Sequence, residues 1–188
     1  RVDWEGHGKV NEKDLYEEFL FLLSKSVKDR ANCDVQLGAC LSGGLDSTSI
    51  VGIALKENLN NFSSTISVCY EDDPTISEKN YLHQARNYFR GNHVFIEHTR
   101  ADLLDNIEKL FLHQELPVPS ASMFLEWSVM KKARELKNIV MLDGQGADEL
   151  LGGYPYYFKF YQNEMLHKKK YKDLIENTYL FRKFLNEV

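Results

Sequence analysis

The stretch LSGGLDST, residues 41–48, decides the fold of this chain and indicates its chemistry. It follows the apolar run 35–40 and precedes the helical run 49–57, so it predicts a strand, a glycine turn and a helix in succession. Two adjacent glycines let the backbone approach a ligand without a Cβ clash, and a helix start offers unpaired N–H groups at the positive end of its dipole. This combination is typical of a phosphate site.

The polar side chains of this stretch fit a polyphosphate that carries a cation. The hydroxyls of Ser42, Ser47 and Thr48 are potential donors to phosphate oxygens. Asp46 would repel phosphate unless a cation lay between them, so it predicts Mg²⁺. A strand-to-helix turn capped by Ser or Asp is the alternative without a ligand. A cap alone does not call for two glycines, three hydroxyls and a carboxylate together.

The pattern lacks the GKS or GKT of a Walker loop and the third spaced glycine of a dinucleotide fingerprint. It resembles the SGGxDS signature of the ATP pyrophosphatases, or PP-loop proteins. This resemblance implies a domain that cleaves ATP to AMP and pyrophosphate while it adenylates a substrate oxygen. Asparagine, β-lactam, GMP, NAD and argininosuccinate synthetases share the signature.

Length and composition fit one ordinary globular domain. The chain has 188 residues, of which 43% are hydrophobic, and no second core is needed. Twenty-eight acidic and 23 basic residues give a net charge of −5, which argues against a general nucleic acid or membrane binder. The three cysteines, Cys33, Cys40 and Cys69, form no CxxC motif, so we expect buried free thiols in a reducing cytoplasm.

We expect a soluble, cytoplasmic protein. No apolar run approaches the roughly 20 residues of a membrane span, and the start RVDWEGHG lacks the layout of a secretion signal. Because the chain opens on Arg1 and stops within a helical pattern at Val188, we expect it to be a piece of a longer enzyme.

The remaining periodicities alternate between strands and helices, which predicts an α/β fold with a doubly wound parallel sheet and helices on both faces. Strands are expected at 35–41, 62–70, 93–99 and 138–142, and helices at 11–30, 49–57, 77–91 and 102–113. A further helix is expected to begin at Ser120 or Ser122 and to run to Leu136. In the order 3, 2, 1, 4, the ligand crevice would lie between the first and fourth strands at their carboxyl ends. Gly52, in the second helix, predicts a close approach to the sheet.

The stretch DGQGADELLGGY, residues 143–154, follows the predicted fourth strand and is the second chemical signal. It contains four glycines together with Asp143, Asp148 and Glu149. Two acidic groups from separate loops can hold one Mg²⁺ that bridges phosphates, so we expect Asp46 and Asp148 to be partners across the crevice. A glycine turn whose acidic residues merely stabilise a helix start is the structural alternative.

Together the two motifs resemble the synthetase domain of the asparagine synthetase family, whose second motif typically is SGEGSDEVFGGY. TISVCY at 65–70, a helix from Glu78, ELPVPSAS at 115–122 and the dipeptide 133–134 follow in the family's order. The likeness covers nearly all of residues 12–160. It implies an adenine nucleotide alpha hydrolase-like fold and one synthetase domain over 1–188, with a leading helix at 1–30, a nucleotide-binding core at 31–154 and a helical extension at 155–188.

The resemblance also implies a set of site residues. Asp46 and Asp148 would hold Mg²⁺, and Gln145 and Asp148 fall at catalytic positions. The residues expected to bind ATP are Leu41, Val68, Asp143 and Gly144 on the adenosine side, and Ser42, Gly43, Gly44, Asp46 and Ser47 on the pyrophosphate side.

Three features limit what transfers from the family. Gln145 stands where many asparagine synthetases carry a glutamate, so a carboxylate role in forming the adenylate does not transfer. A glutaminase domain and the lysine that the family uses near the leaving pyrophosphate are expected elsewhere in the full-length chain. We therefore expect the 188 residues alone to be catalytically incomplete.

The implied activity is that of a glutamine-hydrolysing asparagine synthase type ligase. It adenylates a carboxylate, with aspartate as the leading substrate, and ammonia from glutamine then forms the amide. The alternatives are a relative that amidates a sugar acid, closes a β-lactam or cyclises a lasso peptide, or a non-catalytic module that binds ATP. The expected partners are the carboxylate and ammonia, with no nucleic acid and no membrane, and a homodimer is left open.

Overall fold

The computed structural model describes residues 11–70, 79–89 and 91–187. The chain divides into two compact units, Arg1–Gly144 and Gln145–Val188. The predicted acidic turn at 71–74 and the predicted cap Ser77 lie outside the described residues.

The first unit contains a parallel sheet of four strands, β1 (Leu37–Cys40), β2 (Phe62–Tyr70), β3 (His93–His98) and β4 (Val140–Leu142). The strand order is β3-β2-β1-β4, which confirms the predicted order 3, 2, 1, 4. β1 pairs with β2 on one side and with β4 on the other, so the strand before the first motif neighbours the strand before the second. Their carboxyl ends therefore share one edge of the sheet.

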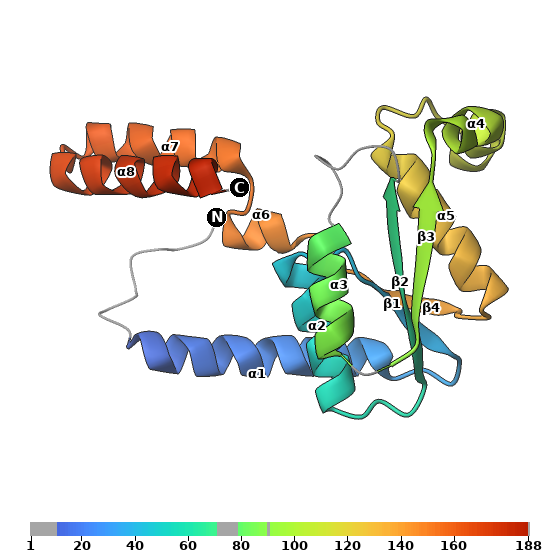
Figure 1. The fold of residues 1–188 in the computed structure, drawn as a ribbon. Coiled ribbons are helices and arrows are strands. Elements are labelled where there is room, and N and C mark those ends of the chain that lie inside the picture. The colour runs from blue at the N-terminus through green and yellow to red at the C-terminus, as the bar shows by residue number, and fades with distance from the viewer. Residues whose placement is uncertain (1–10, 71–78, 90, 188) are drawn as a thin grey trace. The chain divides into compact units, whose positions relative to one another are not determined.

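Helices cover both faces of this sheet, which confirms the predicted α/β class (Figure 1). Helices α1 (Glu12–Ala31), α2 (Leu45–Lys56) and α3 (Lys79–Tyr88) lie on one side, and α4 (Arg100–Gln114) and α5 (Ser122–Glu135) lie on the other.

Alternate side chains of β1 point to opposite faces of the sheet, as expected for a strand. Leu37 and Ala39 are fully buried in a cluster with residues of α1, α2 and α3. Cys40 belongs instead to a second cluster around Ile66, which includes Val129 of α5. These strands are apolar along their length because helices cover both faces of the sheet.

Two helices begin earlier than the sequence pattern predicted. Helix α4 begins at Arg100 rather than 102, because Thr99 and Asp102 form a reciprocal capping box. Helix α2 begins at Leu45 rather than 49, with Gly44 as its N-cap. The apolar periodicity starts late in α2 because its first turn is polar, and this correction places Asp46 and Ser47 inside the helix.

A buried polar contact ties Asn138, which precedes β4, to Ser63 and Ser64 of β2. The amide of Asn138, 4% exposed, donates from Nδ2 to Ser64 Oγ at 2.9 Å and accepts from the hydroxyl of Ser63. A Cβ on Gly38 would lie 2.6 Å from Asn138 Nδ2 and 2.7 Å from Met141 Sδ. A larger residue at this central strand position would therefore displace the side chains of Asn138 and Met141.

The second unit contains α6 (Ala147–Leu151), α7 (Pro155–His167) and α8 (Tyr171–Glu187). Helices α7 and α8 form an antiparallel pair. The rings of Phe158 and Phe181 stack with centroids 4.0 Å apart, and Gln162 donates to Thr178 at 2.9 Å. The predicted division at residue 154 stays a prediction. Among the helices described, none combines the length and the apolar character that crossing a membrane would require.

Gly38→Ala should lower the free energy of unfolding by about 1–3 kcal/mol, because the added methyl group overpacks the site beneath Asn138. Gly52→Ala is the matched control.

The expected close approach of Gly52 to the sheet is wrong, since a Cβ there would meet only the ring of Phe89 at an ordinary 3.5 Å. This control should be neutral or more stable, because alanine is the better helix former. Urea denaturation measures both changes, and equal effects would contradict the contact.

Candidate active site

The glycine turn lies at the carboxyl end of β1 and enters α2 without a side-chain cap. Leu41 continues the sheet by donating its N–H to Ile66 O at 3.0 Å, and Gly43 adopts a φ of +87°. Gly44 is the N-cap of α2 in an extended conformation, and no side chain accepts from the first turn. The first N–H groups of α2 are therefore left to water or a ligand.

Two serine hydroxyls hold the turn in shape. Ser47, 7% exposed, accepts from the N–H of Ser42 at 3.1 Å, and the two hydroxyls lie 3.0 Å apart. Ser42 Oγ accepts in turn from the N–H of Gly44 at 3.2 Å. Sequence reasoning assigned these hydroxyls to phosphate and missed their contacts with each other. Their predicted part in binding phosphate stays a prediction.

Thr48 differs from the other hydroxyl residues of this stretch. Its Oγ1 is buried and has no hydrogen-bond partner among the described residues. Buried hydroxyls are normally paired, so Thr48 is an exception within the first turns of α2.

The second motif reaches the first through the backbone of Gly144. A Cβ on Gly144 would lie 3.1 Å from the Cβ of Asp46 and 3.3 Å from the N of Ser47. Such distances are shorter than ordinary van der Waals contacts. The structure therefore brings Gly144 against the first turn of α2, beside Asp46, as expected for neighbouring parallel strands.

Asp143, which follows β4, contacts both Gly144 and Cys40 of β1. Its Oδ1 accepts from the N–H of Gly144 at 2.7 Å. Burial, followed by the negative charge of Asp143, raises the pKa of the Cys40 thiol to about 12. Cys40 therefore stays protonated at neutral pH and is a packing residue rather than a nucleophile. This contact between the ends of β1 and β4 was not visible in the sequence.

The remaining predicted residues are Val68, Gln145 and Asp148. Val68 is half-buried in β2 and packs beside Ile66. Gln145 and Asp148 belong to the second unit, where Gln145 is exposed and Asp148 is half-buried in the first turn of α6. The predicted pairing of Asp46 with Asp148 stays a prediction.

No group of three or more His, Cys, Asp or Glu side chains gathers at a metal-holding distance within residues 11–70, 79–89 and 91–187. Mg²⁺ typically takes one or two protein carboxylates, with phosphate and water oxygens as its other ligands. The predicted Mg²⁺ ligands are of this sparse type.

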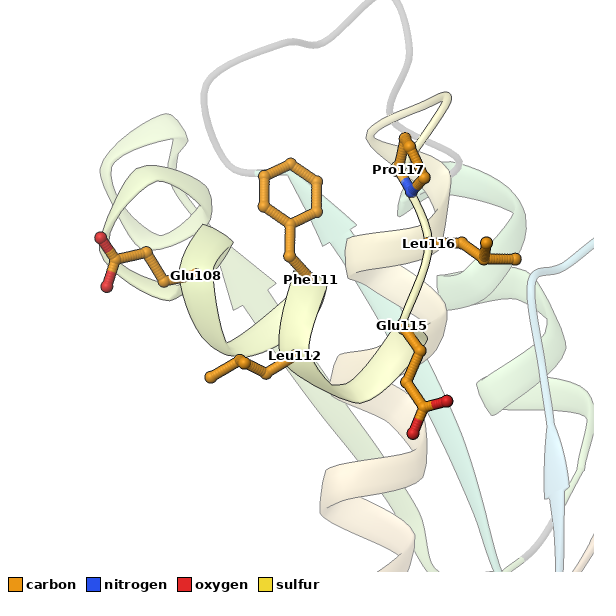
Figure 2. A pocket seen from close by; sticks show the side chains of 6 residues that line it. All are labelled: Glu108, Phe111, Leu112, Glu115, Leu116 and Pro117. Atoms are coloured by element: carbon orange, nitrogen blue, oxygen red, sulfur yellow. The ribbon is translucent and has the colours of Figure 1, made fainter.

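An apolar pocket lies elsewhere in the first unit, at the end of α4 (Figure 2). It measures about 750 Å³ and is lined by Phe111, Leu112, Leu116 and Pro117 with Glu108 and Glu115. Its charged groups are both acidic and would repel a phosphate. The pocket contains none of the predicted site residues, so size alone does not identify the phosphate site.

The fold and the junction define an α/β domain with a glycine turn suited to phosphate. The protein-family model described as asparagine synthase matches residues 18–187. The chain therefore belongs to the asparagine synthase family. The predicted family is thereby confirmed.

Similar proteins include the putative asparagine synthetase [glutamine-hydrolyzing] 2 of Methanocaldococcus jannaschii, 30% identical over 95% of this chain and 34% of that protein. Another is asparagine synthetase [glutamine-hydrolyzing] 2 of Arabidopsis thaliana, 29% identical over 77% of this chain and 26% of that protein. The chain thus spans about a third or less of these curated relatives. Among solved structures, the NH3-dependent NAD synthetase of Campylobacter jejuni has a TM-score of 0.47 at 17% identity, covering 77% of this chain and 61% of that one.

We predict that iodoacetamide leaves Cys40 almost unmodified at pH 8, because a pKa of about 12 keeps it a thiol. Asp143→Asn removes one charge that raises this pKa, so the thiolate fraction and the alkylation rate should increase, about tenfold for each unit by which the pKa falls. Peptide mass spectrometry measures the rate at Cys40, with the urea-unfolded protein as the fully reactive control. An unchanged rate in the variant would contradict the contact between Cys40 and Asp143.

Proposed function

We propose that this chain is the synthetase domain of an ATP-dependent amide-forming ligase and that the glycine turn binds the pyrophosphate part of ATP. The observation that carries the proposal is the junction of Gly144 with the first turn of α2. Two backbones meet there without side chains, beside unpaired N–H groups and the carboxylate of Asp46. Membership of the asparagine synthase family supports the same assignment.

The chain's own residues fit Mg·ATP. The first N–H groups of α2 supply donors for phosphate. Leu41, Val68, Asp143 and Gly144, at or near the carboxyl ends of β1, β2 and β4, would contact the adenosine. Asp46 and Asp148 would hold Mg²⁺, which when bound offsets the charge that develops on the departing pyrophosphate.

The proposed reaction has two steps. An oxygen of the substrate carboxylate forms a bond to the α-phosphorus of ATP, and the bond from that phosphorus to pyrophosphate breaks. Ammonia then attacks the acyl carbon and loses a proton, and AMP leaves with the electrons of the carbon–oxygen bond. Donors at the start of α2 would stabilise pyrophosphate in the first step, because their dipoles are already oriented.

We propose aspartate as the carboxylate and glutamine as the source of ammonia, since both relatives described above are named as glutamine-hydrolysing asparagine synthetases. Gln145 favours a second candidate, amidation or cyclisation of another carboxylate. An amide at that position cannot perform the acid–base role of a carboxylate, although it can still orient a substrate through hydrogen bonds.

The full-length protein, given Mg·ATP, aspartate and glutamine, should release asparagine, AMP and pyrophosphate in equal amounts, because the bond at the α-phosphorus is the one that breaks. Chromatography of nucleotides and amino acids measures AMP and asparagine, and an enzyme-coupled assay measures pyrophosphate. If AMP forms only with another carboxylate, the second candidate is correct. Formation of ADP and phosphate, or no consumption of ATP with any carboxylate, would contradict the proposed class of reaction.

Asp46→Asn should weaken nucleotide affinity in Mg²⁺ by at least about tenfold, or about 1.4 kcal/mol. In EDTA the variant should bind as well as the native protein or better, because a carboxylate facing phosphate is favourable only through the cation. Asp105→Asn, at an exposed position of α4, is the matched control. Calorimetry measures the affinities, and an equal loss in both buffers would rule out a role through the metal.

A further inference from the structure

Two adjacent acidic residues of the second motif differ in their hydrogen bonding. The hydroxyl of Tyr154 donates to Glu149 Oε1 at 2.8 Å, and this hydrogen bond is the main cause that raises the pKa of Tyr154 to about 12. Glu149 is therefore held by the residue that ends the motif. Within residues 145–187, no donor reaches the carboxylate of Asp148.

The chain passes back over Asp148 at the end of α6. Gly152 ends the helix with a φ of +73°, and the N–H of Gly153 donates to Asp148 O at 3.0 Å. A Cβ on Gly153 would lie 1.8 Å from Asp148 Oδ1 and 2.8 Å from its Cγ, but 3.2 Å from its Cα. Asp148 thus occupies the space that any other residue at 153 would fill.

A Cβ on Gly153 would clash with the end of the Asp148 side chain more than with the Asp148 backbone. A methyl group on Gly153 forces the Asp148 carboxylate to another rotamer, whereas its 3.2 Å distance to the Asp148 Cα requires an adjustment of only tenths of an ångström. The fold of the loop therefore tolerates alanine, but the direction of the carboxylate does not.

We propose that Gly153 and Tyr154 are positioning residues, which together make Asp148 rather than Glu149 the carboxylate that this loop presents to magnesium pyrophosphate. The absent side chain of Gly153 leaves room for the carboxylate of Asp148. The hydroxyl of Tyr154 holds the carboxylate of Glu149 through a hydrogen bond. This inference rests on the proposed function of Asp148 as a Mg²⁺ ligand, and it gives the two final residues of the motif a role without contact to the nucleotide.

Gly153→Ala in the full-length protein should weaken Mg·ATP binding about 10-fold to 100-fold, the range typical of residues that orient a metal ligand. Binding of ATP in EDTA should change little, because the loss acts through the metal. Calorimetry measures both affinities, and circular dichroism checks the fold. Gly91→Ala is the matched control, because its added Cβ would meet only His93 Nε2 at 3.9 Å.

A double-mutant cycle separates this inference from the proposed function. Asp148→Asn with Gly153→Ala should bind Mg·ATP no more weakly than Asp148→Asn alone, since the glycine acts through that carboxylate. Native affinity in Gly153→Ala, with a loss in Asp148→Asn, would overturn the inference and leave the proposed function intact. Native affinity in Asp148→Asn would overturn the metal role itself.

Tyr154→Phe provides a second test with almost no change of shape, in case Gly153→Ala fails to fold. Freeing Glu149 adds a mobile carboxylate beside the phosphates, so Mg·ATP affinity should fall severalfold. Adding Glu149→Gln to Tyr154→Phe should restore it, because the released side chain is then neutral. Native affinity in Tyr154→Phe, or a loss that Glu149→Gln does not rescue, would show that Tyr154 does not act by holding Glu149.

Discussion

Two stretches of backbone meet without an intervening side chain at the carboxyl ends of β1 and β4, and the rest of the candidate site depends on this contact. Gly144 lies so close to Asp46 and Ser47 that its missing Cβ would stand 3.1 Å from the Cβ of Asp46. The contact requires adjacent parallel strands, a short turn between β1 and α2, and a glycine shortly after the end of β4. The order β3-β2-β1-β4 supplies the first of these requirements.

The turn between β1 and α2 is ordered by its own side chains, so a ligand does not have to shape it. Ser42 and Ser47 satisfy one another and the backbone of Gly44, while the first N–H groups of α2 keep no side-chain acceptor. Donors already oriented toward a site cost little reorganisation when an anion binds, and this is the physical basis of electrostatic stabilisation in enzymes. Asp46 then needs a cation, since its charge opposes that of phosphate.

Much of the fold and of this site was predictable because the chemistry is local in the chain. LSGGLDST places glycines, hydroxyls and a carboxylate within one turn, and the alternation of strands with helices gives the sheet order by standard winding. The contacts that sequence reasoning missed join residues far apart in the chain. Asn138 above Gly38 and Asp143 beside Cys40 depend on which strands become neighbours and on side-chain direction. The start of α2 was missed because a polar first turn carries no apolar periodicity.

The most direct measurement is an experimental structure of the full-length protein with Mg²⁺ and a non-hydrolysable ATP analogue. We predict that the β- and γ-phosphates accept hydrogen bonds from N–H groups of residues 43–48, that Gly144 lies against the nucleotide, and that a carboxylate oxygen of Asp46 ligates the metal. Phosphates bound away from the glycine turn, or a metal without Asp46 among its ligands, would contradict it.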